Sequence, residues 1–176
     1  MAKLYNELTQ NHIDFIKEQK IFFISSCSNH EVNISGRGYD TFRVLDNNYI
    51  LLADYPGSGN RTARDIKEGA KITLLFTSFN EKPLNLKLFC NGELIEKDED
   101  KWDKYFINFP HLDSNLLKRL MLFKIIKAET SCGYGTPNFE YKGKRENLDN
   151  WATKMYKEKT LDEYISNQDV PPNLGI

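Results

Sequence analysis

Several features that would assign the chain to a class are missing from its 176 residues. The formal net charge is only −1, from 24 basic and 25 acidic residues. A balance this even provides no field that attracts nucleic acid or an anionic membrane. No segment is apolar over the length needed to span a bilayer, and residues 1–15 do not have the apolar stretch of a signal peptide. We therefore expect a cytoplasmic protein that binds neither nucleic acid nor membrane.

Cysteine and histidine are also scarce. The three cysteines, Cys27, Cys90 and Cys132, are far apart and odd in number, so a disulfide framework is not expected. Neither they nor the three histidines have the spacing of metal ligands. No set of serine, histidine and aspartate that would form a catalytic group can be argued either. The sequence thus predicts no metal site and identifies no catalytic residue.

The chain does contain the material of one globular domain, because 40% of its residues are hydrophobic and 12% aromatic. We predict a single domain over 1–176, with a core at about 15–135 and a helical tail at about 145–166. Apolar patterns predict strands at 20–27, 31–35, 41–45, 49–54, 71–79 and 120–130, and helices at 63–68, 98–109, 147–156 and 161–165. A further helix is expected at 2–19, interrupted or restarted near Asn11. The expected class is mainly β (α+β), an antiparallel barrel with peripheral helices.

Residues 84–96 allow two interpretations. Asn91-Gly92 is a strong hairpin signal between two apolar runs. The same residues could form one long strand with a glycine bulge.

The loop from Gly57 to Thr62 is the candidate binding element. Its glycines allow backbone N–H groups to approach an oxyanion, and Arg61 can add a charge-assisted contact. The alternative is a plain turn that caps the following helix through Asn60 or Thr62. It is not a P-loop, because the lysine is missing, and the dinucleotide fingerprint lacks its third glycine and the βα units that would follow. A cofactor phosphate is the anion that we expect here.

Three segments in order carry a resemblance to a known family. They are Phe42-Arg43-Val44-Leu45, a strand ending in Tyr55 followed by Asn60-Arg61-Thr62-Ala63-Arg64-Asp65-Ile66, and Lys71–Phe76. Together they resemble the pyridoxamine 5′-phosphate oxidase-like FMN-binding split-barrel family. Residues 130–137 (TSCGYGTP) are similar to the Ser-Cys-Gly-Tyr-Gly segment of an uncharacterised subgroup.

The resemblance implies a split β-barrel that binds FMN, with the flavin at the interface of a homodimer and a small-molecule substrate or electron donor. It implies that the cofactor is bound by Arg43, Val44, Tyr55, Ser58, Gly59, Asn60, Arg61 and Thr62. Thr62 stands where the oxidases carry lysine, and the tail lacks their tryptophan and arginine ending, so pyridoxamine phosphate oxidation is not carried over. The expected function is a flavin-dependent oxidoreductase. Its alternatives are a non-catalytic flavin- or haem-binding protein, or an enzyme that uses deazaflavin or degrades haem.

Overall fold

The computed structural model describes residues 2–28, 31–57, 60–168, 170–172 and 174. Within them, eight strands form one antiparallel sheet in the order β3-β2-β6-β7-β8-β5-β4, with β1 paired to β8. The strands are β1 (Lys3–Tyr5), β2 (Phe22–Cys27), β3 (Val32–Arg37), β4 (Phe42–Val44), β5 (Tyr49–Asp54), β6 (Lys71–Thr77), β7 (Asn85–Ile95) and β8 (Arg119–Ser131). The helices are α1 (Gln10–Glu18), α2 (Arg61–Lys67), α3 (Trp102–Phe106), α4 (Asn147–Lys157) and α5 (Leu161–Asn167), with a 3-10 turn at Ser114–Leu116.

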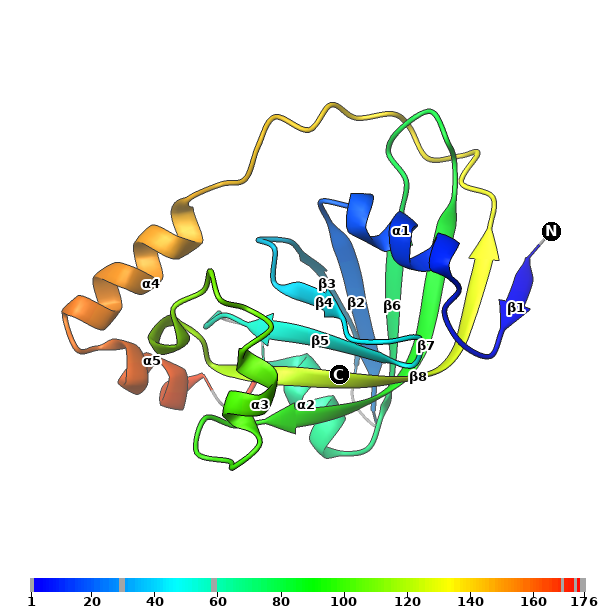
Figure 1. The fold of residues 1–176 in the computed structure, drawn as a ribbon. Helices are drawn as coiled ribbons and strands as arrows, with labels where there is room; N and C mark the ends of the chain where they lie inside the picture. The colour runs from blue at the N-terminus through cyan, green and yellow to red at the C-terminus, as the bar shows by residue number, and fades with distance from the viewer. Residues whose placement is uncertain (1, 29–30, 58–59, 169, 173, 175–176) are drawn as a thin grey trace.

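The sheet is curled into a barrel that stays open between its two edge strands, β3 and β4 (Figure 1). One apolar cluster, which includes Ile24, Leu74 and Leu88, fills the inside and receives α1 and α2. A second cluster, around Leu51 and Phe109, lies on the other face of β5 and β8 under α3, α4 and α5. The predicted antiparallel split barrel is therefore confirmed.

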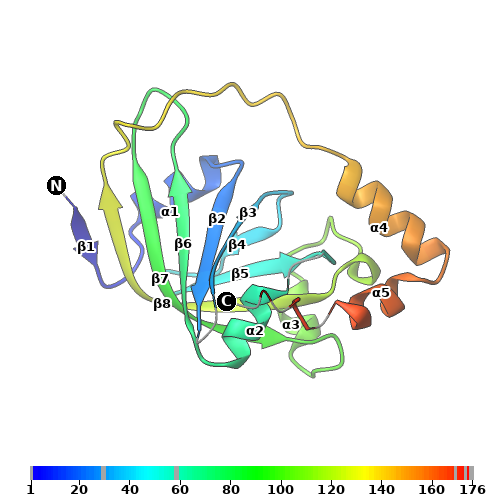
Figure 2. The same cartoon turned by 180° about the vertical axis from the view of Figure 1, so that it is seen from behind.

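Residues 132–146 connect the barrel to the C-terminal helices α4 and α5. They leave the end of β8 and run as an extended arch to α4, which both views show (Figures 1 and 2). None of the helices that the structure describes is long and apolar enough to cross a membrane.

The N-terminal prediction was wrong in part, because residues 3–5 form a strand and the helix starts at Gln10. Thr9 caps that helix: its hydroxyl accepts from the His12 N–H at 3.4 Å, and His12 Nδ1 accepts from the Thr9 N–H at 3.2 Å. The helix predicted at 98–109 is only five residues long. A turn in which the Glu99 carboxylate accepts from the Glu96 N–H, at 3.0 Å, precedes it.

Residues 85–95 form one continuous strand, so the long-strand interpretation is correct and the hairpin is wrong. The predicted glycine bulge is not at Gly92: the pairs Phe89–Lys127 and Cys90–Ile125 leave Ile126 as the extra residue, so the bulge lies on β8. Gly92 is needed because α2 packs directly on this strand. A Cβ at Gly92 would lie 2.7 Å from Ile66 Cγ1.

Candidate functional site

The opening between β3 and β4 is lined by a row of polar side chains on β3. Strand alternation turns Asn33, Ser35 and Arg37 toward the inside of the barrel, while Val32 and Ile34 stay exposed. In register they lie beside Ser26, Ile24 and Phe22 of β2, which face the core. Polar side chains on an inward-facing side are unusual for a packed core, so this row is a candidate site.

Arg37 spans the opening and reaches β5. Its Nη1 donates to Asp54 Oδ1 at 3.0 Å, and the Asp54 side chain is only 6% exposed. The Arg37 Nε and the Ser35 Oγ are buried and have no hydrogen-bond partner. Unsatisfied buried donors are costly, and each one calls for an explanation such as a missing ligand. Because the two unsatisfied donors lie on the same face of β3, this face is a candidate site for a ligand with hydrogen-bond acceptors.

Asn33 joins the same row to the start of α2. Its amide donates to Thr62 Oγ1 at 2.9 Å and to Ser26 Oγ at 3.1 Å. Asn60 and Thr62 are both buried. The predicted loop residues Ser58 and Gly59 lie outside the described residues. The structure therefore brings Thr62, one of the predicted binding residues, to the inner face of β3.

Arg61 lies at the outer end of this region and is held by a carboxylate. Arg61 Nε and Arg64 Nη2 both donate to Glu31 Oε1, the second at 3.2 Å, and Arg61 Nη2 donates to the Pro172 carbonyl at 3.1 Å. A backbone N–H bond and these two guanidinium groups lower the pKa of Glu31 from 4.5 to about 2. Glu31 thus presents a carboxylate that is ionised at neutral pH to Arg61, which was predicted to bind phosphate, and to Arg64.

A cavity of about 630 Å³ opens beside Arg37. Such a volume is within the range of small-molecule and cofactor sites. Its walls come from β3, β5, the β3–β4 connection and the arch. They include Arg37, Tyr39, Ala53, Tyr55 and Lys144.

Tyr55 and Tyr39 tie the arch and α4 to this cavity. The Leu148 N–H donates to the Tyr39 hydroxyl at 3.2 Å, and Lys144 pairs with Asp149 at 3.2 Å. Burial and the neighbouring Asp149 carboxylate raise the pKa of Tyr55 to about 12. Tyr55 therefore keeps its proton at any physiological pH and serves as a neutral polar wall.

Arg43, in contrast, is placed on the outer layer. It stands opposite Leu51 in the β4–β5 pair, and its guanidinium lies 5.0 Å from the Phe109 ring centre. Its Nη1 and Nη2 donate to the Asp40 carboxylate at 2.7 and 3.2 Å, and its Nε donates to the Asn108 carbonyl at 3.1 Å. Among the described residues, Arg43 and Arg61 share no hydrogen-bond partner.

The neighbouring Val44 lines a different, smaller cavity between β4 and α1. The structure thus places Tyr55 at the larger cavity, Thr62 beside the β3 row, and Arg43 and Val44 on β4.

Sequence reasoning missed Arg37 and Glu31. The predicted strand ended at residue 35, but β3 continues to Arg37. The available signal was the alternation itself, because Asn33, Ser35 and Arg37 continue one face at a spacing of two. The signal for Glu31 was weak, since only the fold brings it to Arg61 and Arg64.

No group of three or more metal-binding side chains occurs among the residues described. Cys90 is buried, and burial raises the pKa of its thiol to about 12, which makes it unreactive. Cys27 and Cys132 are exposed and unpaired. The polar row and its cavity are therefore the main candidate site.

A curled antiparallel sheet that stays open between two edge strands, with polar side chains along the opening, defines the class of split-barrel proteins. No family model matches the chain. A curated relative is the pyridoxamine 5′-phosphate oxidase family protein ustO of Aspergillus flavus, 29% identical over 141 residues. The match covers 78% of this chain and 57% of that protein, so the chain spans little more than half the length of its relative.

Solved structures share the fold at low sequence identity. A candidate pyridoxamine 5′-phosphate oxidase of Lactobacillus delbrueckii is 15% identical with a TM-score of 0.58, over 70% of this chain and 94% of that one. HupZ of Group A Streptococcus, also 15% identical, gives 0.53 over 67% and 89%. The FAD binding protein of Mycobacterium smegmatis is 8% identical and gives 0.52 over 72% and 97%. The resemblance to pyridoxamine 5′-phosphate oxidase-like split-barrel proteins is thereby confirmed. The subgroup segment at 130–137 stays a prediction.

Proposed function

We propose that the chain is a flavin-binding protein that holds FMN at the opening between β3 and β4 and uses it in a redox reaction on a small molecule. The proposal is supported by the split-barrel fold, by the relative from Aspergillus flavus and by the FAD binding protein among the similar structures. The observation that carries it is the pair of buried, partnerless donors on β3, Arg37 Nε and Ser35 Oγ.

The chemistry of these donors fits a phosphate. A guanidinium N–H and a hydroxyl both donate to anionic oxygens, and charge-assisted bonds of this kind are the strong ones. Thr62, in the first turn of α2, contacts Asn33 of the same row, and the buried Asn60 directly precedes this helix. Arg61 would complete the group by turning from Glu31 toward the anion. Ser58 and Gly59, in the loop before α2, stay part of the proposed phosphate site.

The cavity of about 630 Å³ would take the ring system. Tyr39 and Tyr55 supply flat walls and Ala53 leaves room between them. The arch, through Tyr141 and Lys144, limits the access of water. When bound, the flavin supplies hydride or single-electron transfer. The part of the protein is to bind, orient and shield it.

Arg43 could bind the cofactor phosphate, as predicted, only if its ion pair with Asp40 were broken. In the structure its donors are already bound to Asp40 and to the Asn108 carbonyl, so it adds less to an anion site than Arg37 does. We propose that the homodimer predicted from the family resemblance closes the open side of the cavity, and that the protein works in the cytoplasm.

The test is a spectroscopic titration. The purified chain is examined for flavin absorption and then titrated with FMN, FAD, a deazaflavin and haem. We expect FMN to bind, and Arg61→Glu to weaken it at least tenfold because repulsion replaces a charge-assisted bond. Riboflavin, which has no phosphate, is the matched ligand control and should bind both forms equally.

A colourless protein that binds no FMN would overturn the proposal. An equal loss of FMN and riboflavin in Arg61→Glu would show that Arg61 acts on the fold and not on the phosphate. NAD(P)H oxidation with bound FMN supports catalysis. If FMN binds without any turnover, the non-catalytic alternative is correct.

A further inference from the structure

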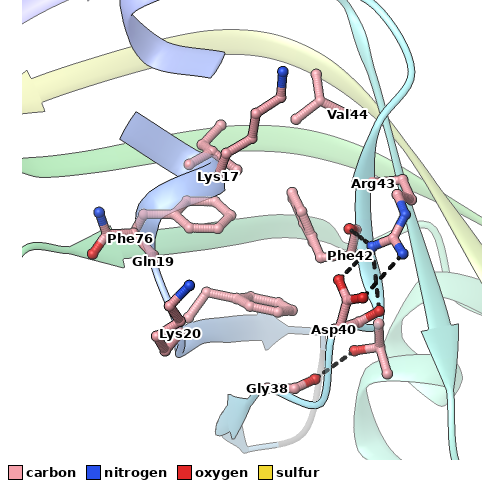
Figure 3. A pocket seen from close by; sticks show the side chains of 12 residues that line it. Lys17, Gln19, Lys20, Gly38, Asp40, Phe42, Arg43, Val44 and Phe76 are labelled. Atoms are coloured by element: carbon pink, nitrogen blue, oxygen red, sulfur yellow. Dashed lines mark hydrogen bonds and ion pairs between the residues drawn. The ribbon is translucent and has the colours of Figure 1, made fainter. Parts of the chain in front are cut away.

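A second, smaller cavity of about 330 Å³ lies between the end of α1 and β4 (Figure 3). Its floor is aromatic. Phe42 packs against Phe22 and Phe76, with ring centres 4.9 and 5.1 Å away, and Ile16 and Val44 extend the apolar surface. Phe22 and Phe76 are themselves buried, so Phe42 is the ring that a ligand would contact. Such a floor favours a flat or apolar molecular body.

The rim of this cavity has the opposite character. Lys17 and Lys20, from the end of α1 and the residues after it, line the cavity, and Figure 3 shows both ammonium groups beside it. Within the described part of the chain neither ammonium has a hydrogen bond or an ion pair. The one carboxylate in the lining, that of Asp40, is bound to Arg43 at 2.7 Å. The charge left for a ligand is therefore positive.

We propose that this cavity binds a small carboxylate with an apolar body. The carboxylate would pair with the ammonium group of Lys17 or of Lys20, which Figure 3 shows at opposite ends of the cavity, and the body would lie on Phe42. The volume suits a molecule of about one ring, at the lower end of small-molecule sites. The lysines at the mouth would bind the carboxylate and the apolar base would contact the body. The cavity would therefore select both the orientation and the negative charge of the ligand.

The cavity also adjoins the larger one. Lys20, Gly38 and Thr41 line both. A carboxylate bound here would lie next to the proposed flavin. We therefore assign this carboxylate as the substrate of the flavin site. This last step rests on the proposed function, whereas the binding itself does not.

The test uses benzoate as the probe and benzamide as its neutral isostere, on the full chain, with amide NMR shifts as the readout. We expect benzoate to move the signals of residues 17–20 and 38–44 and to bind at least fivefold more tightly than benzamide. Lys17→Glu/Lys20→Glu should abolish that preference. Lys124→Glu/Lys157→Glu makes the same charge change elsewhere on the surface and should preserve it. Lys17→Gln/Lys20→Gln serves as a milder second variant.

Equal affinity for benzoate and benzamide, shifts elsewhere, or an unchanged preference in both lysine variants would overturn the proposal. An FMN titration of the same samples separates it from the proposed function. If benzoate binds as expected and FMN does not bind, only the flavin proposal fails. If FMN binds and benzoate does not, only the carboxylate site fails. A change in the bound flavin spectrum on adding benzoate supports the substrate role.

Discussion

Arg37 and Arg43 stand six residues apart, on either side of the β3–β4 connection, and the fold gives them opposite surroundings. Arg37 faces the opening of the barrel, where it pairs with the buried Asp54 and keeps one buried Nε without a partner. Arg43 faces the outer layer, where Asp40, Asn108 and Phe109 engage its guanidinium. The comparison shows that an arginine is available to a ligand only where its neighbours leave a donor unused.

The connection between the two residues explains how neighbours in sequence reach different environments. Tyr39 and Asp40 both have positive φ, 69° and 55°, which turns the chain sharply. The Thr41 hydroxyl donates to the Gly38 carbonyl at 2.7 Å and stabilises the turn. A Cβ at Gly38 would lie 3.2 Å from the Lys20 carbonyl oxygen, so a larger residue would press on the same turn.

The largest effect is expected from the acidic partners of the two arginines. Asp54→Ala leaves Arg37 half-enclosed without its counter-charge, and breaking a buried pair costs about 3–5 kcal/mol in the free energy of unfolding. Asp40→Ala removes a carboxylate that is 70% exposed and should cost less than about 1 kcal/mol. Urea unfolding of both variants measures the difference. Equal losses would mean that the Arg37 pair is no more buried in solution than the Arg43 pair.

The next effect concerns ligand affinity. Arg37→Lys keeps the positive charge but removes Nε and the planar guanidinium, so FMN should bind about tenfold more weakly or worse. Arg43→Lys is the matched control, and its FMN affinity should change less than about twofold, because its donors serve Asp40. Flavin absorption titrations give both constants. A greater loss in Arg43→Lys would return the phosphate site to the residue that the sequence resemblance implied.

The smallest expected effect is the loss of folding stability at acid pH when Glu31 becomes protonated. Its pKa is lowered to about 2, so its ion pairs stabilise the fold above pH 4.5 and this stabilisation is lost as the pH falls toward 2. Glu31→Gln lacks this titration, so the stability difference between the two proteins should shrink between pH 5 and pH 3. Urea midpoints at the two pH values check this. A constant difference would show that Glu31 is not held by Arg61 and Arg64 in solution.

The strongest sequence patterns predicted the fold well. Tyr49–Asp54 was predicted with its observed bounds, and 71–79, 120–130 and 147–156 each correspond to one element of the structure. These are long or densely apolar segments, whose periodicity reflects burial directly. The errors fall where local signals compete with tertiary contacts. Asn91-Gly92 was a turn signal in isolation, but the glycine is there because α2 packs on β7.

The site was predictable only in part. Residues 57–62 and Tyr55 were predicted as binding residues from glycines and from the family resemblance, and Thr62 does lie against the inner face of β3. The direction of each arginine could not be predicted. It depends on which strand lies opposite, and that is set by the closure of the sheet and not by neighbouring residues.

By itself the sequence determined the class of fold, because alternation and apolar runs are local consequences of burial. The sequence also identified residues 57–62, which run into the first turn of α2, as a candidate for anion binding. Only the tertiary structure decided which side chains face the opening. It brought Arg37 of β3 to Asp54 at the end of β5, left the Arg37 Nε and Ser35 Oγ without partners, and bound Arg43 to Asp40. The physical reason is that a donor is available to a ligand when it is buried and unpaired, and both conditions arise only from contacts between distant segments.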